Sequence, residues 1–159
     1  MRPTRNDLAE NARAALIALL NARLADALDL AAIMKQAHWN VRGPHFQPLH
    51  ELFDSVTDAV RGHADDIAER ITALGGVAKG RTQDIAAATA LPEYPLQAEA
   101  GADHVKAVAD RLAMTTNAMR AAIGESDEMG DAVTADLFTG VARDLDKQLW
   151  FVEAHENKS

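Results

Sequence analysis

The residues best suited to chemistry in this chain lie in one short stretch, HWNVRGPHFQPLHELFD, at positions 38–54. The chain has only six histidines, and this stretch holds His38, His45 and His50, with Asp54 one helical turn after the last of them. Two imidazoles and a carboxylate form a ligand set suited to iron, zinc or manganese. A tight loop that gathers histidines by chance is the simpler alternative, so the elements around the stretch must decide.

Glycine and proline signals divide the chain into four long helices. Asn6 or Asp7 is expected to cap the first helix, and Gly124 to end the third. Pro92 and Pro95 fall in a long connection that has room for one short helix. The expected helices cover about 7–41, 46 to the glycine pair at 75–76, 103–123 and 131–156, and the connection covers 77–101.

Two helical pairs with tight turns, joined by one long crossover, predict an all-α, ferritin-like four-helix bundle. The bundle domain is expected at 7–156, with short tails at 1–6 and 157–159. The net charge of −8 opposes general attraction to nucleic acid or anionic membranes and suits the handling of cations. The chain has no cysteine, no apolar leader and no apolar run long enough for a membrane span, so a cytoplasmic location is expected.

The second expected helix has two faces at about 100° per residue. Its apolar residues gather on one side, whereas the candidate ligands lie on the other. A solvated polar face is the simpler interpretation of that second side. The Gly43–Pro44 turn, however, brings His38 and His50 to a similar height, so that they and Asp54 can meet at one ion. The polar face comprises His50, Asp54, Asp58, Arg61, Asp65 and Glu69.

Asp65 and Glu69 form a second pair one turn apart on the same face. Along the helix axis, Asp65 lies roughly 16 Å from Asp54 and Glu69 roughly 28 Å from His50, too far for side chains to bridge. Either this pair is unrelated to the histidines, or it completes the site of a neighbouring copy. In a two-fold dimer with antiparallel second helices, the histidine end of one chain faces the Asp65/Glu69 end of the other.

Four segments of the chain resemble the Dps family, the mini-ferritins or DNA-binding proteins from starved cells: KQAHWNVRG, LHELFD, HADDIAERITALGG and ARDLDKQLWF. The resemblance extends from TRND at residue 4 to the end of the fourth helix. It implies a hollow dodecamer that oxidises Fe(II), preferentially with hydrogen peroxide, and stores ferric mineral inside. It also implies a ferroxidase site made of His38, His50 and Asp54 from one subunit with Asp65 and Glu69 from its two-fold partner, a site that zinc or manganese can also occupy.

Four further residues carry expectations. The resemblance suggests that Asp131 and Asp136 line a three-fold pore for cations, although acidic residues also favour any helix N-terminus. Trp39, next to His38, is a possible electron donor that protects against stray oxidants, but packing is the commoner role for both Trp39 and Trp150.

DNA binding is expected to be weak or absent, because the leading segment MRPTRN has only Arg2 and Arg5 and no lysine. Two rival functions remain open at this point. One is a nucleoid-associated, DNA-compacting protein whose iron chemistry is secondary, and the other is a structural assembly that holds zinc.

Overall fold

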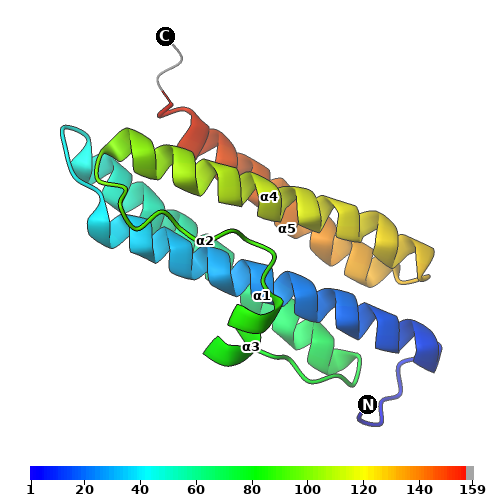
Figure 1. The fold of residues 1–159 in the computed structure, drawn as a ribbon. Coiled ribbons are helices and arrows are strands. Elements are labelled where there is room, and N and C mark those ends of the chain that lie inside the picture. Colours follow the sequence, from blue (N-terminus) through cyan, green and yellow to red (C-terminus); the bar gives the residue numbers. More distant parts are fainter. Residues whose placement is uncertain (157–159) are drawn as a thin grey trace.

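The computed structural model describes residues 1–156, so the expected tail at 157–159 lies outside the described residues. Four long helices form a bundle of two antiparallel pairs, α1 with α2 and α4 with α5 (Figure 1). The short helix α3 lies on the crossover and packs against the outside of α1. The expected all-α, ferritin-like fold with its long crossover is therefore confirmed. The helices are α1 (Glu10–Asn40), α2 (Phe46–Ala73), α3 (Thr82–Ala88), α4 (Gly101–Glu128) and α5 (Ala132–Glu153).

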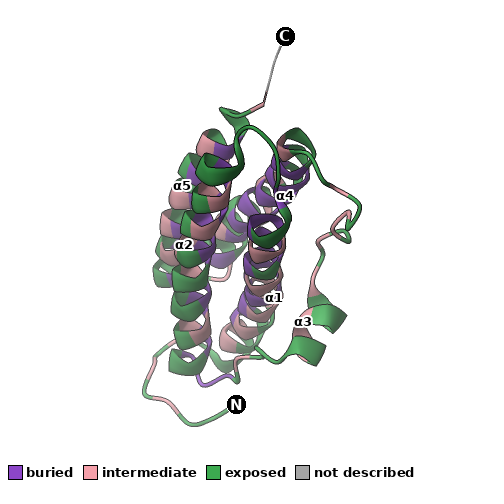
Figure 2. Cartoon of the chain, turned by 90° about the vertical axis from the view of Figure 1, so that its left-hand side faces the viewer, coloured by how far each residue is buried: buried purple, intermediate pink, exposed green. Residues whose placement is uncertain are grey.

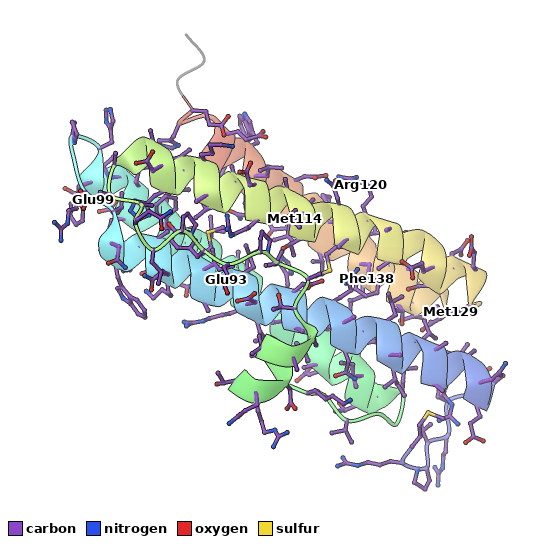
Figure 3. The ribbon with its side chains drawn as sticks, viewed as in Figure 1. Glu93, Glu99, Met114, Arg120, Met129 and Phe138 are labelled. Carbon is purple, nitrogen blue, oxygen red and sulfur yellow. The ribbon has the colours of Figure 1, made fainter. Side chains whose placement is uncertain are left out.

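The bundle core lies between the two helix pairs, where the buried faces meet (Figure 2). Phe53 of α2 and Phe138 of α5 are fully buried there, and Figure 3 shows Phe138 pointing from α5 into the bundle. The apolar face predicted for the second helix is also found. Its members are buried except Ala59, which is partly exposed; the buried ones are Phe53, Val56, Val60, Ala64, Ile67, Ile71 and Leu74. Within residues 1–156, no helix is both long and apolar enough to cross a bilayer.

Two expectations about helix ends are wrong. The third long helix does not stop at Gly124 but continues to Glu128, because Ser126 beyond it remains buried against the bundle. The chain turns instead at Gly130, whose φ of 81° belongs to the left-handed region that favours glycine. The first helix begins at Glu10 without a side-chain cap. The Asn6 side chain accepts a hydrogen bond from the Leu8 amide, in the turn before that helix.

The crossover is held to α1 and α4 by hydrogen bonds at several points along its length. Near its middle, the Thr89 hydroxyl donates to Asp29 at 2.7 Å and the Ala90 amide donates to Asp26 at 2.9 Å, both acceptors on α1. Further on, Arg111 of α4 donates to the backbone carbonyls of Pro92 and Glu93. Figure 3 labels Glu93 on this segment, where the crossover runs across the bundle.

Candidate metal centre

The imidazole rings of His38 and His50 each form a hydrogen bond with the backbone carbonyl of the other residue. The Nδ1 atom of His38 lies 2.7 Å from the carbonyl oxygen of His50, and Nδ1 of His50 lies 2.8 Å from the carbonyl oxygen of His38. A carbonyl can only accept, so both Nδ1 atoms must carry a proton. The two rings stack with centroids 3.6 Å apart. In the neutral form of either ring the lone pair is therefore on Nε2, a nitrogen through which histidine can bind a metal.

The local sequence explains this exchange of hydrogen bonds. His38 lies in the last turn of α1, where carbonyl groups have no partner within the helix. The turn at Gly43–Pro44 brings the second turn of α2 beside it, and the His50 ring satisfies that carbonyl. His38 is 9% exposed, whereas His50 is more accessible. Within residues 1–156, neither Nε2 atom has a hydrogen-bond partner, so both remain available to a ligand.

Asp54 lies one turn after His50, as predicted, but its carboxylate is held by Lys35 of α1. The hydrogen bond from the Lys35 ammonium lowers the pKa of Asp54 below its ordinary value, which keeps this exposed carboxyl ionised at neutral pH. Sequence interpretation missed Lys35. The signal was its position three residues before His38, which places both side chains on one face of α1.

Asp65 and Glu69 are exposed on α2, on the predicted polar face and well beyond reach of the histidines. In the described part of the chain, no three histidine, aspartate or glutamate side chains come close enough together to hold a metal. Within the single chain Asp54 is paired with Lys35, and its meeting with His38 and His50 at one ion stays a prediction. The chain brings the two histidines together and pairs the nearby Asp54 with Lys35. Asp65 and Glu69 remain distant from the histidines.

The two acidic residues predicted for a pore differ in their surroundings. Asp131 is 3% exposed and caps α5, accepting from the amides of Val133 and Thr134. Its other oxygen pairs with Arg70 at 2.7 Å. Burial raises the pKa of Asp131, but hydrogen bonds from Thr134 and Arg70 outweigh it and hold the pKa below its ordinary value. Asp131 thus acts as a helix cap in this chain, while Asp136 is exposed beside a hollow between α2 and α5.

Several aromatic side chains lie outside the bundle core. Trp39 is 67% exposed and Trp150 is 64% exposed, so neither packs in the core of the single chain. Phe46 is also exposed and lies with its ring centroid 5.0 Å from that of His50. His63 is partly buried and lies 2.8 Å from the Asp144 carboxylate.

Comparisons with known proteins agree on one family. A family model described as a ferritin-like domain matches residues 17–158. The DNA protection during starvation protein of Agrobacterium fabrum is 47% identical over 152 residues, which cover 96% of this chain and 94% of that protein. The fine tangled pili major subunit of Haemophilus ducreyi is 37% identical over 136 residues, 86% of this chain and 71% of that protein.

Solved structures give the same result. The tetragonal form of Mycobacterium smegmatis Dps superposes with a TM-score of 0.92 at 32% identity, covering 98% of this chain and 93% of that one. DpsA14 from Streptomyces coelicolor gives 0.91 at 39% identity, covering 96% of this chain and 90% of that one. With the bundle, the crossover helix and the paired histidines in place, the chain belongs to the Dps family of ferritin-like proteins.

Proposed function

We propose that this protein oxidises Fe(II) in the cytoplasm, with hydrogen peroxide as preferred oxidant, and stores the ferric product inside a hollow dodecamer. The observation that carries the proposal is the exchange of hydrogen bonds between His38 and His50, which prepares two Nε2 atoms for a metal before any metal binds. Neutral imidazoles hold a ferrous ion at neutral pH, and carboxylates favour the ferric state. Zinc and manganese suit the same ligands.

The ligand set requires a second copy of the chain. His38, His50 and Asp54 supply one half of each site, and Asp65 and Glu69 from a two-fold-related copy supply the other. The separation of these two groups within one chain supports this arrangement, as does the exposure of both acidic side chains. Two copies packed with antiparallel α2 helices form two equivalent sites.

Two ferrous ions at such a site supply the two electrons that the reduction of one peroxide molecule requires. Each Fe(II) gives one electron to the same peroxide molecule, the O–O bond breaks, and two protons from solvent complete two molecules of water. The products are two Fe(III) ions and water, so neither precursor of the hydroxyl radical remains. Asp136, exposed on α5, is a candidate for the entry path of Fe(II), and Trp39 is a candidate electron donor beside His38.

The experiment loads the protein anaerobically with Fe(II), adds hydrogen peroxide, and follows ferric absorbance and hydroxyl radical. His50→Ala and Asp65→Ala are expected to lose fast, radical-free oxidation. His45→Ala, in the exposed turn, and Asp66→Ala, the exposed neighbour of Asp65, are the matched controls and are expected to keep it. Bound metal without peroxide consumption in the wild type would instead support the zinc-holding structural assembly.

Complementation tests whether the site is shared between copies. Co-expression of His50→Ala with Asp65→Ala should recover about one quarter of the wild-type sites, because half of the pairs are mixed and each mixed pair rebuilds one of its two sites. If each site lay within one chain, the mixture would be as inactive as either variant alone.

We further propose that DNA binding is weak or absent at physiological salt. The Arg2 amide donates to the Gly75 carbonyl at 2.7 Å, so the leading segment folds back onto the bundle, and the net charge of −8 opposes phosphate contact. Gel shifts over a salt series with wild type and an Arg2→Ala/Arg5→Ala variant test this. Tight binding at about 150 mM salt that depends on both arginines would favour the nucleoid-associated alternative.

A further inference from the structure

A tyrosine and a histidine meet where the crossover joins α4. The Tyr94 hydroxyl lies 2.5 Å from Nδ1 of His104, and the two rings are stacked with centroids 6.1 Å apart. His104 is fully buried in the first turn of α4. Tyr94 is partly buried, directly after the Glu93 labelled in Figure 3, and it is the only tyrosine in the sequence. The metal centre proposed above uses neither residue.

The surroundings of the pair favour one arrangement of its protons. Nε2 of His104 is buried without a hydrogen-bond partner among the described residues, and the backbone carbonyls of Asn40 and Ala98, which can only accept, lie near the ring. These carbonyls favour the ring proton on Nε2, which leaves a lone pair on Nδ1 to which the Tyr94 hydroxyl can donate. Burial lowers the pKa of His104, and burial raises the pKa of Tyr94 to about 12. At neutral pH the pair is a neutral phenol bound to a neutral imidazole.

This pair touches the helix end that carries the metal centre. Asn40, whose carbonyl faces His104, is the last residue of α1 and follows His38 by two positions. That interval is about 3 Å along the helix axis. His104 and the backbone of the last turn of α1 thus connect Tyr94 with the histidine pair.

We propose that Tyr94 is an electron donor to peroxide at the metal centre, with His104 as the acceptor of its proton. The inference rests on the proposed function and concerns a site that holds a single Fe(II). Peroxide needs two electrons for conversion to water, and one Fe(II) supplies only one. Tyr94 supplies the second electron, its hydroxyl proton moves to Nδ1 of His104, and two solvent protons complete two waters. The products are Fe(III), a tyrosyl radical and a protonated imidazole.

Arg111 restricts which oxidants can draw on this tyrosine. Its guanidinium carbon lies 5.6 Å from the centre of the Tyr94 ring, and its nitrogens are held by the carbonyls of Pro92, Glu93 and Ala107. A fixed positive charge beside the ring opposes the loss of an electron. The tyrosine is thereby protected from mild oxidants such as Fe(III) and remains available to partly reduced peroxide.

The test is electron paramagnetic resonance on the wild-type protein, frozen after peroxide is added at one Fe(II) per site. A tyrosyl radical is expected, and growth on ring-deuterated tyrosine should collapse its hyperfine splitting, which assigns it to Tyr94. Tyr94→Phe should lose the signal and release hydroxyl radical to a spin trap. Trp150→Phe, an exposed aromatic on α5, is the matched control and should retain the signal.

Two outcomes separate this inference from the proposed function. Fast Fe(II) oxidation by the wild type without any tyrosyl radical overturns the role of Tyr94 and leaves the ferroxidase proposal intact. No accelerated Fe(II) oxidation overturns both. The role of His104 has a test that needs no iron: flash oxidation of Tyr94 by an external photo-oxidant should slow in His104→Gln and lose its solvent isotope effect. An unchanged rate would remove His104 from the proposal.

Discussion

Arg70 near the end of α2 and Asp131 at the start of α5 form an ion pair with an N–O distance of 2.7 Å, and both side chains are largely buried. The same carboxylate accepts from the Thr134 hydroxyl and caps the first turn of α5. One side chain therefore helps to join two helices that belong to different antiparallel pairs and lie far apart in the sequence. Because both oxygens of the Asp131 carboxylate accept hydrogen bonds, removal of this side chain breaks the cap and the ion pair together.

Asp131→Ala is expected to lower the free energy of unfolding by about 2–4 kcal/mol, through loss of the cap and of the partner of a largely buried guanidinium. Asp127→Ala removes an exposed carboxylate at the end of α4 and is the matched control, with an expected change below about 0.5 kcal/mol. Urea denaturation followed by circular dichroism measures both. Equal effects of the two variants would contradict the assigned role of Asp131.

The same residue predicts a dependence of stability on pH. Its pKa is lower in the folded chain than its ordinary value of 3.8, so its contribution is complete well above that pH and disappears as the pH falls below it. The difference in unfolding free energy between wild type and Asp131→Asn should therefore shrink as the pH is lowered through this range. Denaturation series at several pH values measure it, and a difference that grows towards low pH would reverse the assigned sign.

Lys35→Met is expected to raise the affinity of the centre for Zn²⁺ or anaerobic Fe(II) about tenfold, because the ammonium group competes with a cation for Asp54. Titration calorimetry measures the affinity. Lys106→Met, which removes an exposed lysine paired with Asp110, is the control, and a fall in affinity for Lys35→Met would show that Lys35 supports binding.

Gly124→Ala is expected to stabilise the protein by about 0.5–1 kcal/mol. Gly124 lies inside α4, a Cβ there would meet nothing within 4 Å, and alanine favours the helix. Gly130→Ala offers the opposite case, because the positive φ at that turn is strained for alanine and stability should fall by about 1 kcal/mol. Chemical denaturation compares the two, and a loss of stability in Gly124→Ala would place that position against a neighbour in the assembly.

Local signals in the sequence predicted the architecture, and long-range contacts limited the rest. The turn at Gly43 and the end of α2 at Gly75 follow from backbone conformations that few other residues adopt. Gly124 misled because a glycine tolerated inside a helix is indistinguishable from a stop signal until its packing is known. Residue types and spacing selected His38 and His50, but the acceptors of their Nδ1 protons are backbone carbonyls, which no side-chain pattern reveals. The partners Lys35 for Asp54, Arg70 for Asp131 and His104 for Tyr94 come from other elements.

The twelve-residue separation of His38 and His50 has a consequence for the order of events after synthesis. Contacts so close in sequence form early in folding, because little loop entropy is lost when they close. The histidine half of the proposed centre is thus complete as soon as the α1–α2 hairpin forms. In the proposed arrangement, the acidic half arrives only when a second copy associates. A newly made subunit would therefore capture no reactive iron until the shell that is to hold the product has begun to assemble.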